Sequence, residues 1–166
     1  YGRFLYKVKL GWRVGYMGAP MSIANACNKI QGQITSATCA IAQKATEKAL
    51  IEDPIRNTKD MKVAFEERRD MVLNELKLIP GIVCNKPEGA FYIFPNISYY
   101  LEKKYQNKII ENSSDLAMYL LTKGGVATVS GAAFGTNNCL RISYAASEEK
   151  IKKACELIKI SLEELN

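Results

Sequence analysis

Hydrophobic side chains recur at helical spacing through much of the chain, and the clearest stripe lies in its middle. The members of this stripe are Met61, Phe65, Val72, Leu76 and Ile79. Charged residues 66–70 fall mostly on other faces, and Pro80-Gly81 ends the pattern, which predicts an amphipathic helix. A second stripe near the C-terminus contains Ile151, Ala154, Cys155, Ile158, Leu162 and Leu165. Ser147 is the expected N-cap of this second helix, and Glu148 and Glu149 suit its positive end.

Residues 1–53 show a different, less regular pattern. Residues 12–18 predict a short strand that ends at Gly18-Ala19-Pro20, where proline can open a helix through Ile23–Ile30. Thr35 and Ser36 are plausible N-caps of an alanine-rich helix that reaches about Glu52. Asp53-Pro54 should interrupt that helix.

Short strand candidates alternate with loops in the second half of the chain. Segments 82–85 and 90–94 flank a turn and should be neighbours in a small sheet, and residues 98–111 predict a polar, lysine-rich loop. Ser113 or Ser114 can cap a helix that ends at Gly124-Gly125. Strands at 126–129 and 139–144 follow, separated by the small-residue loop 130–138. Long helices around a few short strands predict an α+β fold with helices packed on one sheet face.

Composition narrows the classes of function. The chain has 166 residues, is 48% hydrophobic and carries a net charge of +6, but its lysines are spread over the predicted helices, so we expect no nucleic-acid partner. Five irregularly spaced cysteines and no histidine argue against a zinc site or a histidine-based triad and favour a reduced, cytoplasmic protein. No apolar run reaches the roughly 18 residues of a membrane span, so we expect no membrane partner.

Arg141 is the most informative polar residue of the second half. In Cys139-Leu140-Arg141-Ile142-Ser143-Tyr144, strand alternation places Arg141 on the face opposite Leu140, Ile142 and Tyr144. A guanidinium on so apolar a strand can bind a carboxylate or phosphate through paired hydrogen bonds. Spacing alone favours a plainer alternative, a salt bridge to a surface glutamate.

Three glycine-containing segments are further candidates. Arg13 lies between Gly11 and Gly15, which permit close backbone approach, so an anionic group could bind there. Gly89 beside Phe91-Tyr92, and the loop from Gly131 to Gly135 with Phe134, could face a ligand. Spacing alone favours ordinary turn chemistry for both loops.

Five segments, in order, resemble the aspartate aminotransferase family of fold-type I pyridoxal-phosphate (PLP) enzymes. They are GWRVGYMGAP, QGQITSATCAIAQKA, PEGAFYIFP, SGAAFG and CLRISYA. The resemblance runs from Gly11 onward and implies part of an α/β PLP transferase, with the aminotransferase small domain and the end of the large domain. It also implies that Arg13 binds the cofactor phosphate and that Arg141 binds the substrate α-carboxylate.

One position departs from the family pattern. The family places its Schiff-base lysine six residues before the glycine of GWR, and that position here is Leu5, preceded by Phe4. Lys7 and Lys9 are out of register. We therefore expect no catalytic residue in this chain, no PLP bound by it alone, and an altered or foreign leader over residues 1–10 of a truncated enzyme.

The resemblance also implies the organisation and the activity of the parent enzyme. Residues 1–53 would hold the leader, the end of the large domain and the connecting helix, and residues 54–166 the C-terminal small domain. The complete enzyme would exchange an amino group between an amino acid and a 2-oxo acid, as an aspartate:2-oxoglutarate aminotransferase with PLP as electron sink. The alternative is a non-catalytic, self-associating or binding module of the same fold. In either case we expect a homo-oligomer.

Overall fold

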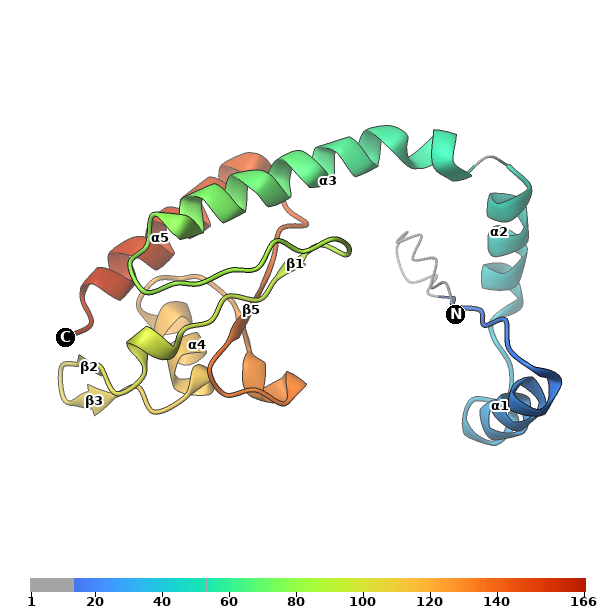
Figure 1. Ribbon diagram of the computed structural model, residues 1–166, viewed down its shortest axis with the longest axis horizontal. Coiled ribbons are helices and arrows are strands. Elements are labelled where there is room, and N and C mark those ends of the chain that lie inside the picture. Colours follow the sequence, from blue (N-terminus) through green and yellow to red (C-terminus); the bar gives the residue numbers. More distant parts are fainter. Residues whose placement is uncertain (1–13, 53) are drawn as a thin grey trace. The chain divides into compact units, whose positions relative to one another are not determined.

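The computed structural model describes residues 14–52 and 54–166. The chain divides into two compact units, Tyr1–Lys59 and Asp60–Asn166. Helices and small antiparallel sheets make up the structure, which confirms the predicted α+β class (Figure 1). Within the described ranges, none of the helices has the length and apolar character needed to cross a membrane.

The first unit contains two helices, α1 (Met21–Ile34) and α2 (Ala40–Ile51). The predicted strand is wrong for residues 14–18, which are irregular, whereas Pro20 does precede a helix: its carbonyl accepts the first helical N–H bonds. The predicted N-caps of α2 are also wrong. Thr35 is the C-cap of α1, and Ser36 has a φ of 62°, so both residues belong to the turn between the helices.

Helix α3 (Pro54–Lys77) begins at the predicted break, with proline at a first-turn position where its missing N–H costs nothing. Its stripe is confirmed from Phe65 to Ile79: Phe65 packs against the core, and Val72, Leu76 and Ile79 are buried. Met61 is an exception, since its side chain is 48% exposed.

The central sheet of the second unit has the antiparallel order β1-β5-β4. Its strands are β1 (Tyr92–Ile93), β5 (Leu140–Ser143) and β4 (Val129–Ser130). All three are shorter than predicted. Segment 82–85 contributes only one bridge, between Val83 and Asn96. Pro95 lies beside that bridge and has no N–H to extend a ladder.

The predicted polar loop 98–111 is partly wrong, because it contains regular structure. A 3-10 helix, η1 (Ser98–Tyr100), precedes a hairpin of β2 (Lys104–Tyr105) and β3 (Lys108–Ile109). The two-residue turn places Gln106 at a φ of 54°, as primed hairpin turns require. Strands this short and polar have no alternating pattern from which they can be predicted.

Two further helices complete the unit, α4 (Ser113–Thr122) and α5 (Glu148–Glu163). The N-cap of α4 is Asn112 and not a serine: its side-chain oxygen accepts from the backbone N–H groups of Ser114 and Asp115 at 2.9 and 3.1 Å. Ser147 precedes α5 as predicted, but its side chain forms no cap bond.

One hydrophobic core joins these helices to the sheet. Its most buried members come from α3, β1, α4 and α5 and include Leu76, Ile93, Leu116, Leu120 and Ile158. The Tyr119 hydroxyl on α4 donates to the Ser161 carbonyl on α5 at 2.7 Å and ties the two helices together. The central strand that carries Arg141 therefore rests on a continuous packed layer.

Candidate functional site

Arg141 lies on β5, the central strand of the sheet, and the predicted alternation is confirmed. Leu140 and Tyr144 are buried, and Ile142 packs against the core from the same face. Arg141 is on the other face and is partly buried. Its backbone is held on both sides, because β5 pairs with Val129 of β4 and with Tyr92 of β1.

Two aromatic rings contact the Arg141 guanidinium. The guanidinium carbon lies 4.4 Å from the centroid of the Tyr92 ring and 4.3 Å from that of Phe134, which follows β4 in the 3-10 helix η2 (Gly131–Phe134). Both distances are within the range of cation–π attraction. The guanidinium forms no hydrogen bond or ion pair with any residue in the described ranges. The salt bridge to a surface glutamate is therefore not seen in this part of the chain.

Tyr92 and Phe134 lie in the two loops that the sequence offers as possible ligand-facing segments, but their contact with Arg141 is not predicted from the sequence. Spacing alone favours a turn for both loops. The second loop does contain a turn, in which Gly135 adopts a φ of 83° and ends η2. Tyr92 lies opposite Ser143, which is two residues from Arg141 on the same face of β5. This pairing brings the Tyr92 ring beside Arg141, where it could face a ligand. The spacing of Tyr92 and Arg141 along the chain contains no signal of that long-range pairing.

The phosphate-binding candidate, Arg13, lies outside the described residues, as do Phe4, Leu5, Lys7 and Lys9. Its role stays a prediction. Around Arg141 the contacting groups are one guanidinium and two rings, a set that can bind a carboxylate but has no amine for a Schiff base.

A cluster of three charged side chains lies at the surface near the turn that precedes β1. Arg69 donates two hydrogen bonds to the Asp70 carboxylate, at 2.8 and 3.2 Å, and Lys86 approaches the same carboxylate at 3.2 Å. The hydrogen bonds from Arg69, followed by that from Lys86, lower the pKa of Asp70 to about 2. Because all three charges are paired, this cluster is a surface ion-pair network and not a site poised for proton transfer.

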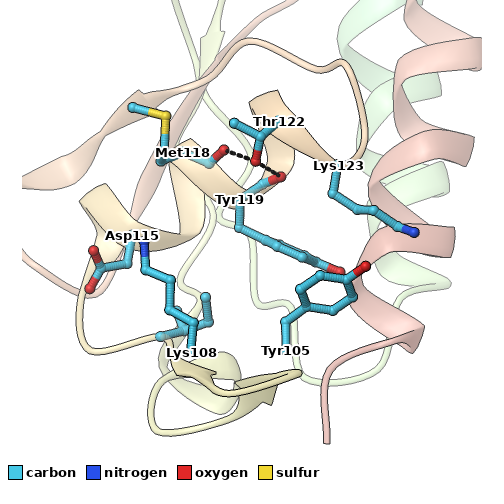
Figure 2. Close-up of a pocket in the computed structure, with 8 residues that line it drawn as sticks. Tyr105, Lys108, Asp115, Met118, Tyr119, Thr122 and Lys123 are labelled. Carbon is cyan, nitrogen blue, oxygen red and sulfur yellow. Dashed lines mark hydrogen bonds between the residues drawn. The ribbon is translucent and has the colours of Figure 1, made fainter.

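The shallow cavity of Figure 2 lies between the β2–β3 hairpin and α4 and has a volume of about 250 Å³. Three of its polar side chains already have partners. Lys123 pairs with Glu164 at 3.1 Å, Asp115 accepts from the Glu111 N–H, and Thr122 donates to carbonyls of its own helix. Arg141 does not line this cavity. We assign no function to it.

The cysteines of the described residues form no metal cluster, since no group of three or more Cys, Asp or Glu there could hold an ion. Their environments differ. Cys27 and Cys39 are exposed, whereas burial raises the pKa of the Cys84 and Cys155 thiols to about 11. At pH 8 only about 0.1% of such a thiol is the reactive thiolate.

This difference predicts two classes of thiol. With dithionitrobenzoate at pH 8, we expect Cys27 and Cys39 to react at least about 10-fold faster than Cys84 and Cys155. Absorbance gives the rates, and mass spectrometry of the labelled peptides assigns them. In urea all sites should react together. Labelling of Cys84 in the fast phase would contradict its burial.

Comparison with known proteins places these observations in context. A family model described as aminotransferase class I and II matches residues 10–158. A probable aspartate/prephenate aminotransferase of Rhizobium leguminosarum bv. phaseoli is 43% identical over 152 residues, which are 90% of this chain and 37% of that protein. A bifunctional aspartate aminotransferase and glutamate/aspartate-prephenate aminotransferase of Petunia hybrida is 42% identical over 155 residues, 92% of this chain and 32% of that protein.

Solved structures agree with these relatives. The aspartate aminotransferase of Rhizobium meliloti superposes with a TM-score of 0.80 at 39% identity, over 94% of this chain and 39% of that one. An aromatic aminotransferase of Pyrococcus horikoshii gives a TM-score of 0.77 at 32% identity, over 93% and 39%. The predicted resemblance and fold are confirmed. The chain spans about a third to two fifths of the length of these proteins.

Proposed function

The chain belongs to the aminotransferase class I and II family, and from this premise we propose that it supplies the substrate-carboxylate-binding part of an aspartate-type aminotransferase. Arg141 would bind the α-carboxylate of the amino-acid or 2-oxo-acid substrate. The single observation that carries this proposal is the state of Arg141: a partly buried guanidinium between two rings, with no anionic partner among the described residues.

The chemistry of Arg141 suits this role. A guanidinium presents N–H donors in a rigid, planar fork that matches the two oxygens of a carboxylate. The rings contact the guanidinium through cation–π attraction, and its N–H donors form no hydrogen bond within the described residues, so they can bind a ligand. Held this way, a substrate carboxylate would fix the orientation of the rest of the substrate for reaction.

The test is a titration of the chain with succinate, a dicarboxylate that cannot transaminate, followed by nuclear magnetic resonance (NMR) of the arginine Nε–H groups. We expect saturable binding that shifts the Arg141 signal. Butane-1,4-diamine, a matched cation, should produce no shift. Absence of saturable succinate binding would overturn the proposal.

PLP would be the cofactor of the complete enzyme, where it supplies the electron sink of transamination. The proposed domain organisation assigns residues 1–53 to the end of the large domain and residues 54–166 to the small domain. Arg13 would bind the PLP phosphate. The leucine at position 5 leaves no amine where the family pattern has its Schiff-base lysine, so we propose that this chain alone is inactive.

This predicts the outcome of a direct assay. The chain, incubated with PLP, aspartate and 2-oxoglutarate, should produce no oxaloacetate above the rate of PLP alone. A coupled malate dehydrogenase assay measures the rate, with a complete aspartate aminotransferase as positive control. Turnover together with borohydride trapping of PLP on a single lysine, such as Lys7, would contradict the prediction.

A second candidate function, self-association, is favoured by the apolar surface of the first unit. No residue of α1 is buried, and α2 buries only Ala42. Large apolar side chains are exposed along both helices, among them Met21 at 74%, Ile34 at 72% and Ile51 at 74%. Exposed apolar side chains in this number favour contact with a second copy of the chain.

We therefore expect a dimer in sedimentation-velocity experiments at tens of micromolar, with twice the 18.5-kDa mass of the chain. The double variant Met21→Gln, Ile34→Gln should shift the equilibrium toward monomer, because it removes apolar area from the contact. Leu78→Gln, at a 66% exposed position of the second unit, is the matched control and should remain dimeric. A monomer for the unsubstituted chain would refute this candidate.

A further inference from the structure

We propose that Tyr92 and Phe134 form an aromatic clamp, a pair of positioning residues that holds the Arg141 guanidinium in place before a carboxylate arrives. This inference rests on the proposed function of Arg141 and deepens it. The two rings come from the two elements that flank β5: Tyr92 from β1, and Phe134 from η2 directly after β4. Their centroids lie 4.4 and 4.3 Å from the guanidinium carbon.

Each ring has its own support. Phe94 contacts the Phe134 ring edge-on with a centroid distance of 6.0 Å, and Phe91 contacts the Tyr92 ring at 4.5 Å. Neither clamp residue depends on Arg141 alone for its position. Each ring therefore has a further contact that can hold it beside the arginine.

The backbone of η2 fixes where Phe134 lies. A Cβ on Gly131 would come within 2.4 Å of the Cys139 carbonyl oxygen and 2.5 Å of that of Thr136, so the loop can close this tightly only with glycine. Ser130 caps η2 and also bonds through its hydroxyl to Ser113 and Ser114 of α4, at 2.8 and 2.9 Å. The loop that carries Phe134 is thus tied to a buried helix terminus.

The clamp reduces the conformational freedom that an arginine side chain would otherwise lose when it binds a ligand. A free arginine side chain has many rotamers, and ordering it on binding weakens affinity. An acidic partner would order it but would also occupy its N–H donors and neutralise its charge. Two rings order the guanidinium through cation–π contact while all five donors remain available.

The experiment uses the full chain and compares ring removal with ring retention. Phe134→Leu and Tyr92→Leu remove a ring and keep apolar bulk, whereas Phe134→Tyr and Tyr92→Phe keep the ring. Each leucine variant should weaken succinate binding by roughly 3- to 10-fold, and each aromatic variant should retain the parent affinity within about 2-fold. Tyr99→Leu, which removes an exposed ring that does not contact Arg141, is the matched control and should bind as the parent does.

A second readout reports the clamp without any ligand. Ring currents from Tyr92 and Phe134 should displace the Arg141 Nε–H signal upfield, and this signal is assigned by its absence in Arg141→Lys. The displacement should fall in the leucine variants and persist in the aromatic ones. Thermal unfolding of each variant identifies any general loss of structure, which would change every arginine signal and not this one alone.

The outcomes distinguish the aromatic clamp from the proposed carboxylate-binding role of Arg141. If Arg141→Gln loses succinate binding while both leucine variants bind as tightly as the parent and keep the displaced signal, the clamp is overturned and the carboxylate site stands. If Arg141→Gln binds succinate as the parent does, the proposed function fails. Weakened binding and a lost displacement in the leucine variants, with both retained in the aromatic variants, support the clamp.

Discussion

Replacing Arg141 with glutamine should weaken succinate binding to the chain by about 10- to 100-fold. The substitution removes a charge-assisted, two-bond contact with a carboxylate, and hydrogen bonds to charged groups contribute about 1.5–3 kcal/mol each. Arg141→Lys should give an intermediate loss, because lysine keeps the positive charge but lacks the planar fork. Isothermal titration calorimetry at low ionic strength measures all three dissociation constants.

The controls separate site-specific loss from a change in net charge. Lys159→Gln removes the same charge from an exposed position on α5 and should leave the dissociation constant within about 2-fold of the parent value. Propionate, with a single carboxylate, should still bind in an Arg141-dependent way, because the proposal concerns one carboxylate. An unchanged dissociation constant for Arg141→Gln would show that the carboxylate binds elsewhere.

The second large effect concerns the core beneath the site. Leu116 on α4 is 0% exposed and belongs to the main core cluster. Leu116→Ala should reduce the free energy of unfolding by about 2–5 kcal/mol, because it removes buried apolar area and leaves a cavity between packed elements. That loss is a large share of the total stability of a typical domain, about 5–15 kcal/mol. Urea unfolding followed by circular dichroism measures the difference.

Leu121→Ala is the matched control for this prediction. It is the same substitution on the same helix, at a side chain that is 48% exposed. We expect its free energy of unfolding to change by no more than about 0.5 kcal/mol. Equal losses for the two variants would mean that α4 does not pack in the orientation described.

Much of the fold could be predicted from local patterns, because helices with one buried face repeat that face along the sequence. The predicted stripes from Phe65 to Ile79 and from Ile151 to Leu165 pack against the core, and most of their members are fully buried. Met61 continues the same period but is exposed. Periodicity identifies a helix face, and only the tertiary structure shows how far along the helix that face stays covered.

Two predictions that the structure contradicts, the cap of α4 and the irregular loop at 98–111, have local physical causes. The sequence predicts Ser113 or Ser114 as the cap of α4, but Asn112 precedes both, and its side-chain oxygen accepts from the N–H groups of Ser114 and Asp115. The Ser113 hydroxyl bonds instead to Ser130. The hairpin at 104–109 was missed because two-residue strands carry no periodicity.

Prediction of the candidate site was limited by long-range pairing. Arg141 could be selected because an arginine amid apolar strand residues is unusual, and its face followed from alternation. Tyr92 lies 49 positions earlier and Phe134 is separated by a turn. Only the strand order β1-β5-β4 brings both rings to the guanidinium.

The Ser130 hydroxyl, bonded to two serines at the start of α4, has a consequence for protein engineering. It makes the loop after β4 and the N-terminus of α4 one structural piece. A graft of the Arg141 strand into another scaffold would therefore need four separate segments: β1, the first turn of α4, η2 and β5. The smallest portable form of the proposed carboxylate site is therefore the folded stretch from β1 to β5, and a peptide that contained β5 alone would not retain it.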